Sequence, residues 1–271
     1  MNTQSTLEQA KSPSHFRAAI CARTVLVGAW ALIAALCCPA PAARAQDASA
    51  PAAAATASPS QPYVGKYDVY AGYVNFNSPH IGLIENGFHV QGGVNPRRWL
   101  ALGVDYSSAN GSLLLVPTEL PAAKQVAISQ ALSQLMAAGV IPPTYVLTVP
   151  TDSYTQTFAA GPQWMIRHYP RATFFLRPSV GAIRERATPH PTNAVAVLFA
   201  QQLAPAGYKL DWTGFYGVGF GTDLQATKHF GLRAQLDIVH DHLFNDLLRD
   251  SRNTFRFSIG PSFHFGKNVA K

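Results

Sequence analysis

Three glycines give the sequence its one stretch that could resemble a phosphate-binding loop. Gly217, Gly219 and Gly221 alternate with Val218 and Phe220. The dinucleotide-binding fingerprint instead has the spacing GxGxxG and lies between a strand and a helix. Small residues that alternate with bulky ones are typical of one face of a strand. We therefore predict a strand here and no cofactor site.

A second motif, His240-Asp241-His242, could in principle bind a metal ion. His240 and His242 would lie on the same face of a strand, and imidazole nitrogen is a common zinc ligand. A protein zinc site needs at least three such ligands, and the sequence identifies no third one. We assign no catalytic, cofactor-binding or metal-ligating residue.

A set of charged residues recurs at one parity of the alternating segments described below, which would place them on a single face. These residues are Asp68, Asp105, Arg167, Arg177, Glu185, Asp223, Arg233, Asp237, Asp241 and Arg256. The set contains both signs, and buried charges need partners of the opposite sign. If the face is enclosed, the sequence predicts a mutually neutralising network that fills the interior.

The elements that must position these residues are strands, because apolar and polar residues alternate with a period of two. In residues 254–266, Phe255, Phe257 and Ile259 share one face, and Arg256 and Ser258 share the other. Eight segments follow this pattern with varying regularity. They are residues 67–76, 87–95, 99–107, 154–167, 172–185, 212–225, 230–241 and 254–266.

These segments predict an all-β fold, an eight-stranded antiparallel transmembrane up-and-down β-barrel. Each is about as long as the 9–11 residues of a tilted membrane strand. Short turns at 95–98, 168–171 and 226–229 alternate with longer connections at 77–85, 108–153, 188–210 and 243–252, as in outer-membrane barrels. The predicted lipid-facing residues are Leu100, Leu102, Val104, Leu232, Leu236, Ile238, Phe255, Phe257, Ile259, Phe263 and Phe265.

The N-terminal residues indicate export. Basic residues precede an apolar run at 24–36, and Ala43-Arg44-Ala45 has the form of a cleavage site, so residues 1–45 are expected to be a signal peptide. Residues 46–63 are rich in Ala, Pro and Ser and are interpreted as a disordered linker. Residues 64–271 would form the barrel domain. Without the leader, the net charge falls from +7 to +4, which weakens a nucleic-acid-binding interpretation.

Two local features refine this prediction. Pro162, Pro178 and Pro261 fall inside predicted strands, where each would require a bulge or leave a carbonyl unpaired. The long connection at 108–153 contains residues 122–139, which are rich in helix formers, with Pro121 as a possible first helical residue and Gly139 as a possible C-cap. We expect a short helix there, outside the barrel.

The segments ENGFHVQGGVNPRRWLALGVDYS, FAAGPQWMIRH, FYGVGFGTDLQ and RFSIGPSFHF resemble the eight-stranded outer-membrane β-barrel family, the OmpA/OmpX-like transmembrane barrels. The resemblance implies a bacterial outer-membrane protein with both termini in the periplasm. It implies contact with outer-membrane lipid and lipopolysaccharide, and with the barrel assembly machinery during biogenesis.

We expect a structural or interaction role, in which surface loops meet an extracellular partner that the sequence does not identify. The first alternative is a narrow pore for small solutes. The second is a lipid A-modifying enzyme, since some outer-membrane barrels place His with Ser and an acidic residue near the outer rim. A soluble lipocalin-like binding barrel would instead turn its apolar residues inward.

Overall fold

Each of the alternating segments forms a strand in the structure, a computed structural model that describes residues 63–248 and 252–269. The predicted signal peptide and nearly all of the predicted linker lie outside these residues. The strands are longer than the sequence pattern suggests. They are β1 (Gly65–Ser78), β2 (Leu83–Arg97), β3 (Leu100–Leu115), β4 (Val149–Ile166), β5 (Ala172–Pro189), β6 (Lys209–Gln225), β7 (Phe230–Asp241) and β8 (Arg252–Asn268).

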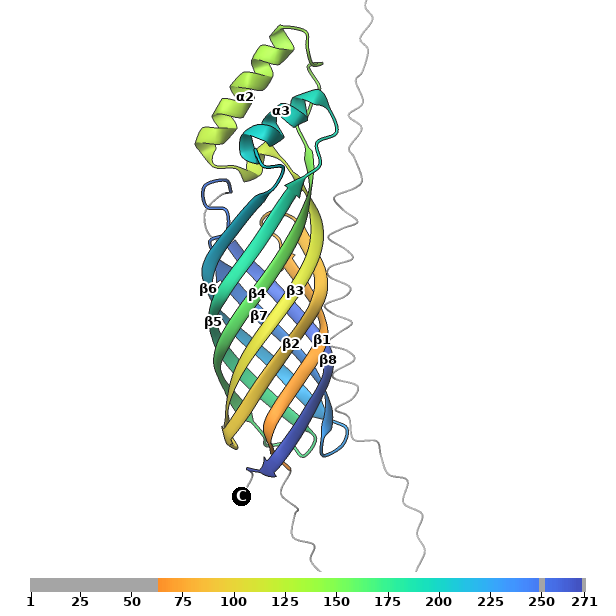
Figure 1. The fold of residues 1–271 in the computed structure, drawn as a ribbon, viewed down its shortest axis with the longest axis vertical. Coiled ribbons are helices and arrows are strands. Elements are labelled where there is room, and N and C mark those ends of the chain that lie inside the picture. Colours follow the sequence, from red (N-terminus) through yellow and green to blue (C-terminus); the bar gives the residue numbers. More distant parts are fainter. Residues whose placement is uncertain (1–62, 249–251, 270–271) are drawn as a thin grey trace, which may run out of the picture. The chain divides into compact units, whose positions relative to one another are not determined.

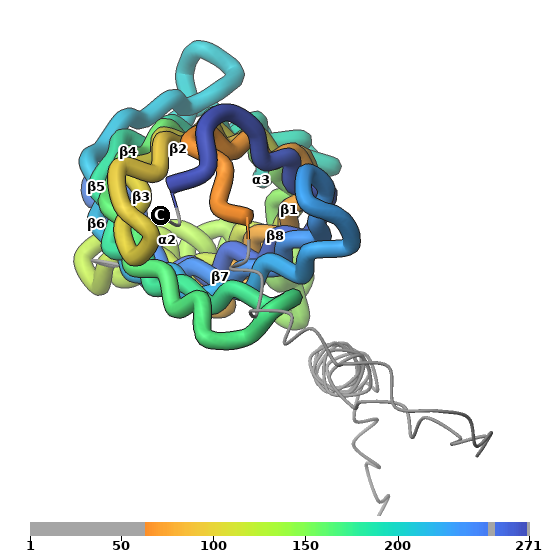
Figure 2. The backbone as a smooth tube through the Cα atoms, turned by 90° about the horizontal axis from the view of Figure 1, so that it is seen from below, coloured from red at the N-terminus to blue at the C-terminus, as the bar shows by residue number. Residues whose placement is uncertain are grey.

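The strands close into a barrel in chain order, β1 to β8, with every neighbouring pair antiparallel (Figure 1). Closure is made by β1, in which Tyr67 pairs with Val94 of β2 on one side and with Phe265 of β8 on the other. Figure 2 shows the backbone as a closed ring. The predicted fold, an eight-stranded up-and-down barrel, is confirmed.

The connections differ in size between the two ends of the barrel. At the end where the described chain starts and finishes, residues 98–99, 167–171 and 226–229 are short turns. At the other end lie the long connections at 116–148 and 190–208. The β1–β2 connection also lies at this second end, but it is only the turn at 79–82. The prediction of a longer connection at 77–85 is therefore wrong.

Pro162 and Pro178 lie opposite each other on β4 and β5, and they cause no bulge. Paired residues bracket them without a shift in register: Ala160↔Val180 and Trp164↔Leu176. The two missing N–H groups therefore fall at one place on the β4–β5 seam. Gly161 allows the backbones to approach there, because a Cβ atom on it would lie 2.1 Å from the Pro178 carbonyl oxygen.

Pro261 is accommodated in the same way on the β1–β8 seam. The register on that seam is unchanged between Tyr70↔Ser262 and Tyr73↔Ile259, so the bulge considered from the sequence is absent here too. The register shifts of the barrel instead lie near its ends, between Gly65 and Tyr67 on β1 and between Val94 and Arg97 on β2.

Two α-helices lie in the long connections, at the end of the barrel away from residues 63 and 269, the ends of the described chain (Figure 1). The helix α2 (Ala122–Ala137) occupies the segment rich in helix formers. Pro121 is its N-cap rather than its first residue, and Gly139 follows the C-cap with a φ of +69°. The second helix, α3 (Ala194–Leu203), was not predicted. It begins at Asn193, whose side chain accepts a hydrogen bond from the Ala196 amide. A short 3-10 helix, η1 (Pro117–Glu119), precedes α2.

Candidate functional site

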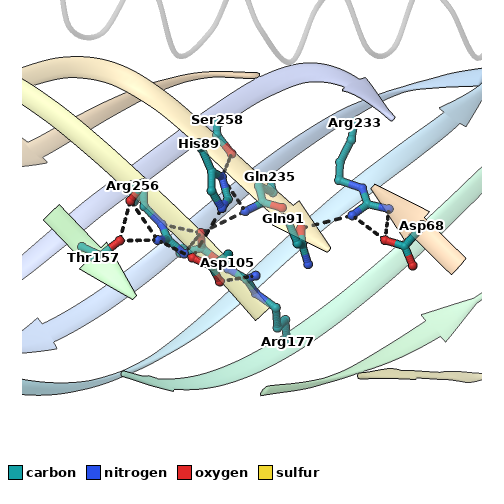
Figure 3. A network of polar contacts seen from close by, with 12 residues as sticks. Asp68, His89, Gln91, Asp105, Thr157, Arg177, Arg233, Gln235, Arg256 and Ser258 are labelled. Atoms are coloured by element: carbon teal, nitrogen blue, oxygen red, sulfur yellow. Dashed lines mark hydrogen bonds and ion pairs between the residues drawn. The ribbon is translucent and has the colours of Figure 1, made fainter. Parts of the chain in front are cut away.

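The lumen contains a network of buried arginine and aspartate side chains from opposite sides of the barrel (Figure 3). Arg256 of β8 lies 3.0 Å from Asp105 of β3 and 2.9 Å from Asp237 of β7. Arg177 of β5 contacts the same two carboxylates, at 2.7 and 3.2 Å. Two cations and two anions therefore form a closed, neutral group across the lumen. All four side chains are at most 1% exposed.

A second group surrounds Arg233 of β7, nearer the end of the barrel opposite the helices. Its guanidinium contacts Asp223 of β6 at 2.9 Å and Asp68 of β1 at 3.4 Å. It also donates to Gln91 Oε1 on β2 at 3.1 Å. Arg233 is fully buried, and its donors reach acceptors on three strands. This group adds a second cross-connection to the lumen.

The glycines of β6 make room for the network. A Cβ atom on Gly219 would lie 1.8 Å from Oδ1 of Asp237. A Cβ atom on Gly221 would lie 2.6 Å from the ring of Phe175. The alternation that resembled a phosphate loop is thus an inner strand face that neighbouring side chains fill.

Polar contacts continue toward the end with the helices. Glu85 of β2 accepts a hydrogen bond from Thr155 of β4 at 2.9 Å. Glu185 of β5 accepts one from Ser153 at 3.0 Å. Asp241 of β7 accepts one from the amide of Leu243, at the start of the β7–β8 connection. These carboxylates hold strands and loops together near the helical end.

The inner face also carries apolar side chains among these polar ones. Ala159, Ile183, Phe215 and Val239 point inward and join one buried cluster with residues of the long connections. The rest of that cluster comes from strand ends (Leu83 and Val149) and from the connections: Ile81, Leu120, Ile128, Leu147, Ala196, Phe199, Leu243, Phe244, Leu247 and Leu248. We call the segments 116–148, 190–208 and 242–248 the cap. The cap is thus folded onto the barrel by a shared core.

Nine of the ten predicted network residues have buried side chains on the inner face. Arg167 is the exception: it lies in the turn after β4 and donates to the Arg98 carbonyl and to Asn95 Oδ1, at 3.3 Å for the latter. Its hydrogen bonds therefore go to neutral groups at the rim. The sequence prediction omitted Glu85, His89, Gln91 and Gln235. Glu85, His89 and Gln91 share the inner parity of β2, which was the signal available for them.

The network includes a Ser–His–Asp contact, which has the residue types of a hydrolytic triad. His89 Nδ1 lies 3.1 Å from Ser258 Oγ, and His89 Nε2 lies 3.4 Å from Asp105 Oδ1. Ser258 and His89 have no exposed surface, and both Arg177 and Arg256 also bind Asp105. A substrate carbonyl needs access to the nucleophile. This contact is closed to any substrate and acts as part of the packing.

The two histidines of the His240-Asp241-His242 motif lie on the outer side at the helical end, whereas Asp241 is buried on the inner face. His240 Nδ1 is 2.8 Å from Asn253 Oδ1, and its ring packs against Tyr216 and His242. Within residues 63–248 and 252–269, no group of three or more His, Cys, Asp or Glu residues is arranged to hold a metal ion. The same residues contain no helix long and apolar enough to cross a membrane.

The outer face of the barrel is apolar over most of its height. All the residues predicted to face lipid point outward, and most are substantially exposed; Val104, for example, is 63% exposed. Aromatic side chains lie toward both ends of this apolar band. Those toward the end opposite the cap include Tyr67, Trp99, Trp164, Phe230 and Phe265, and those toward the cap include Tyr73, Phe88, Tyr106, Phe158, Trp212 and Tyr216.

The cap carries one carboxyl group with an unusual environment. Burial raises the pKa of Glu119, in η1, to about 7. Its Oε2 atom is buried and has no hydrogen-bond partner among the described residues. The neighbouring Leu120 belongs to the shared core. The protonation state of Glu119 is therefore coupled to the packing of the cap.

No protein-family model and no curated protein sequence matches the chain. Among solved structures, the chain is similar to Ail, the attachment invasion locus protein of Yersinia pestis, with 12% identity and a TM-score of 0.44. That match covers 74% of this chain and 99% of Ail. Neisserial surface protein A is 12% identical with a TM-score of 0.45, covering 73% of this chain and 96% of that one.

A third similar structure is the outer membrane protein OprG from Pseudomonas aeruginosa. It is 8% identical with a TM-score of 0.37, and the match covers 76% of this chain and 98% of OprG. The strand pairing of the chain itself defines the fold. It is the closed eight-stranded antiparallel barrel, the fold class of these outer-membrane proteins.

Proposed function

We propose that this protein is an integral outer-membrane barrel with a closed lumen, which presents its folded cap at the cell surface as an interaction module. The observation that carries the proposal is the polarity of the two barrel faces. The inner face buries Arg177, Arg233 and Arg256 with their aspartates, and the outer face exposes an apolar band. A barrel built to fold in water would have the opposite arrangement.

The physical argument for a membrane rests on both faces together. Monomeric soluble proteins rarely expose apolar patches larger than a few hundred Å². In hydrocarbon, such a surface is favourable, and a closed barrel leaves no strand edge unpaired. Aromatic residues toward both ends of the band match the girdles of transmembrane barrels. A soluble lipocalin-like barrel is disfavoured for the same reason.

The interior argues against the pore alternative. An eight-stranded barrel has a lumen just wide enough to be filled by side chains. Here the two arginine groups cross it, and the apolar core beneath the cap covers the helical end. An ion would have to displace paired charges and then a packed apolar layer. We therefore infer that the protein does not conduct in its folded state.

The cap offers the surface for a partner. Val126, Val140, Val146 and Leu198 are each more than half exposed on it. The two ends of the described chain meet at the other end of the barrel, where Tyr63 donates to the Gly266 carbonyl at 2.7 Å and the Val269 amide donates to the Val64 carbonyl at 2.9 Å. With the termini in the periplasm, as is usual for barrels with an even number of strands, the cap faces outward.

Three measurements on the mature protein test the proposal. Migration on gels with and without boiling, together with resistance to carbonate extraction of outer membranes, should show a folded barrel embedded in lipid. Planar-bilayer recordings should then show no stepwise conductance. A soluble protein without a heat-dependent shift would refute the membrane barrel. Regular conductance steps that change when Arg177 is replaced would refute the closed lumen.

A further inference from the structure

The outer face of strands β2 to β5 changes character in successive rows of paired residues. One row, nearest the middle of the barrel, is apolar: Gly92, Val104, Ala160 and Val180. The next row toward the cap contains Val90, Tyr106, Phe158 and Ala182. Two further rows are mostly polar and contain the arginines: Phe88, Ser108, Gln156, Arg184 and Trp212, then Asn86, Asn110, Tyr154, Arg186 and Leu210.

The polar rows lie beyond the part of the barrel that a bilayer needs. Strands β4 and β5 each have 18 residues, whereas a tilted membrane strand uses about 9–11. The additional residues are toward the cap, where the outward side chains become hydroxyls, amides and guanidinium groups. This places the rows at the boundary between hydrocarbon and head groups.

Arg184 and Arg186 stand out on this face because no carboxylate among the described residues forms an ion pair with them. Arg184 donates to Gln156 Oε1 at 3.3 Å and lies over the Trp212 ring, 5.7 Å from its centroid. Arg186 lies over the Tyr208 ring at 4.3 Å. Neither forms an ion pair with any residue that the structure describes. The nearby Asp152 instead contacts His190 at 2.9 Å. Stacking on the aromatic rings orients both guanidinium groups and leaves N–H groups of each available to a ligand.

Two hollows lie on this face, on either side of the row that contains Phe88, Gln156 and Arg184. The one toward the cap is a groove of about 610 Å³, lined by Asn86, Asn110, Asp152, Tyr154 and Arg186 among others. The other is an apolar depression of about 690 Å³ that includes Val90, Gly92, Val104, Ala160 and Val180. A polar groove and an apolar depression, separated by one row of side chains that includes Arg184, match a ligand with a polar head and hydrocarbon chains.

We propose that this face is a binding site for a phosphorylated glycolipid of the outer leaflet, the chemistry of lipid A. Arg184 and Arg186 would hold a phosphate, since guanidinium groups bind phosphate with charge-assisted, bidentate hydrogen bonds. The hydroxyl and amide side chains of the groove suit sugar hydroxyls, and the apolar depression accepts acyl chains. The inference rests on the proposed function, because it places this face in the outer leaflet.

The site is tested by native mass spectrometry of the detergent-solubilised barrel with added lipid A, dephosphorylated lipid A or phosphatidylglycerol. We expect the wild-type protein to retain lipid A in preference to both other lipids. The double variant Arg184→Ala/Arg186→Ala should retain about tenfold less, the effect of losing one or two charge-assisted hydrogen bonds. The matched control is Arg97→Ala/Arg171→Ala, which removes two arginines at the other end, one of them stacked on Trp99.

A second pair of variants tests the apolar half without changing charge. Ala160→Leu fills the depression and should also lower lipid A retention. Ala234→Leu adds the same volume to the outer face of β7, away from the site, and should not. Migration on gels with and without boiling verifies that each variant is a folded barrel. A protein that is not a membrane barrel would fail this gel test, whereas a barrel without the lipid site would pass it and fail only the lipid-retention test.

The proposal is overturned if the two double variants lose lipid A equally, because the attraction would then be a general effect of positive charge. It is also overturned if the wild-type protein retains phosphatidylglycerol as well as it retains lipid A. That result would indicate a site for phospholipid head groups. Unchanged lipid A retention in Arg184→Ala/Arg186→Ala would also overturn it, because it would show that the two arginines do not bind lipid.

Discussion

Replacing Arg256 by alanine should destabilise the barrel more than any change to a surface ion pair. In the folded protein, the Arg256 guanidinium contacts Asp105 at 3.0 Å and Asp237 at 2.9 Å in a site with no exposed surface. Without it, Arg177 alone must neutralise both carboxylates. Removing one partner of a buried ion pair typically costs about 3–5 kcal/mol, because a desolvated charge is left uncompensated.

Urea unfolding of the barrel in lipid vesicles, followed by tryptophan fluorescence, measures this cost. The matched control is Lys209→Ala, which removes the partly exposed ion pair with Asp246 and should change the unfolding free energy by less than about 1 kcal/mol. A compensated variant, Arg256→Met/Asp237→Leu, removes one charge of each sign and should recover most of the loss.

The reasoning would be refuted if the free energy of unfolding of Arg256→Ala lay within about 1 kcal/mol of the wild-type value. It would also be refuted if the compensated variant were less stable than the single one. Either result would mean that water or lipid head groups, rather than the paired arginine, solvate the carboxylates of the lumen.

Three further changes test other parts of the account. Gly219→Ala should cost roughly 1–3 kcal/mol in the same unfolding assay, because the new Cβ atom would lie 1.8 Å from Asp237, whereas Gly92→Ala meets nothing within 4 Å and should be neutral or slightly stabilising. Equal effects would contradict the tight inner face. Since the folded-state pKa of Glu119 is raised to about 7, its contribution to cap stability is complete at low pH and is lost as the pH rises through 7. Proteolysis of residues 116–148 should therefore accelerate from pH 5.5 to 8.5 in the wild-type protein and not in Glu119→Gln; parallel acceleration in both would contradict it. Phe199→Ala should remove up to about 3 kcal/mol of packing beneath α3 and expose residues 190–208 to protease while the barrel stays heat-modifiable; loss of the whole barrel would show that the cap is not a separable layer.

The sequence was sufficient for the barrel because strict alternation determines both the strands and the direction of each side chain. It placed Asp105, Arg177, Arg233, Asp237 and Arg256 on the inner face, where the structure has them. It could not pair them, because partners such as Asp105 and Arg177 are 72 residues apart and meet across the lumen. Those contacts depend on the stagger of all the strands around the barrel.

Two strands with irregular alternation carried information about the loops that the sequence pattern alone did not reveal. Residues 154–167 and 172–185 alternate less cleanly, in part because Ala159 and Ile183 are apolar on the inner face. The structure shows that these residues belong to the core beneath the cap. Apolar residues on an otherwise polar inner face are therefore a signal that loop residues pack against the barrel interior.

The helix α3 was missed for a related reason. Its sequence, AVAVLFAQQL, is a short apolar run with β-branched residues, which periodicity alone does not separate from a strand. Its N-cap, Asn193, was the available signal. The segment around α2 was easier to interpret, because it combines many helix formers with a proline before them and a glycine after them.

Quenching of tryptophan fluorescence by brominated phospholipid acyl chains tests the central claim most directly. Trp99, Trp164 and Trp212 lie on the outer face and are between 44% and 53% exposed. If the apolar face contacts lipid, vesicles of brominated lipid should quench the emission strongly, and aqueous iodide should quench it little. Emission that is unaffected by bromine and readily quenched by iodide would show that the outer face meets water, and would contradict the membrane barrel.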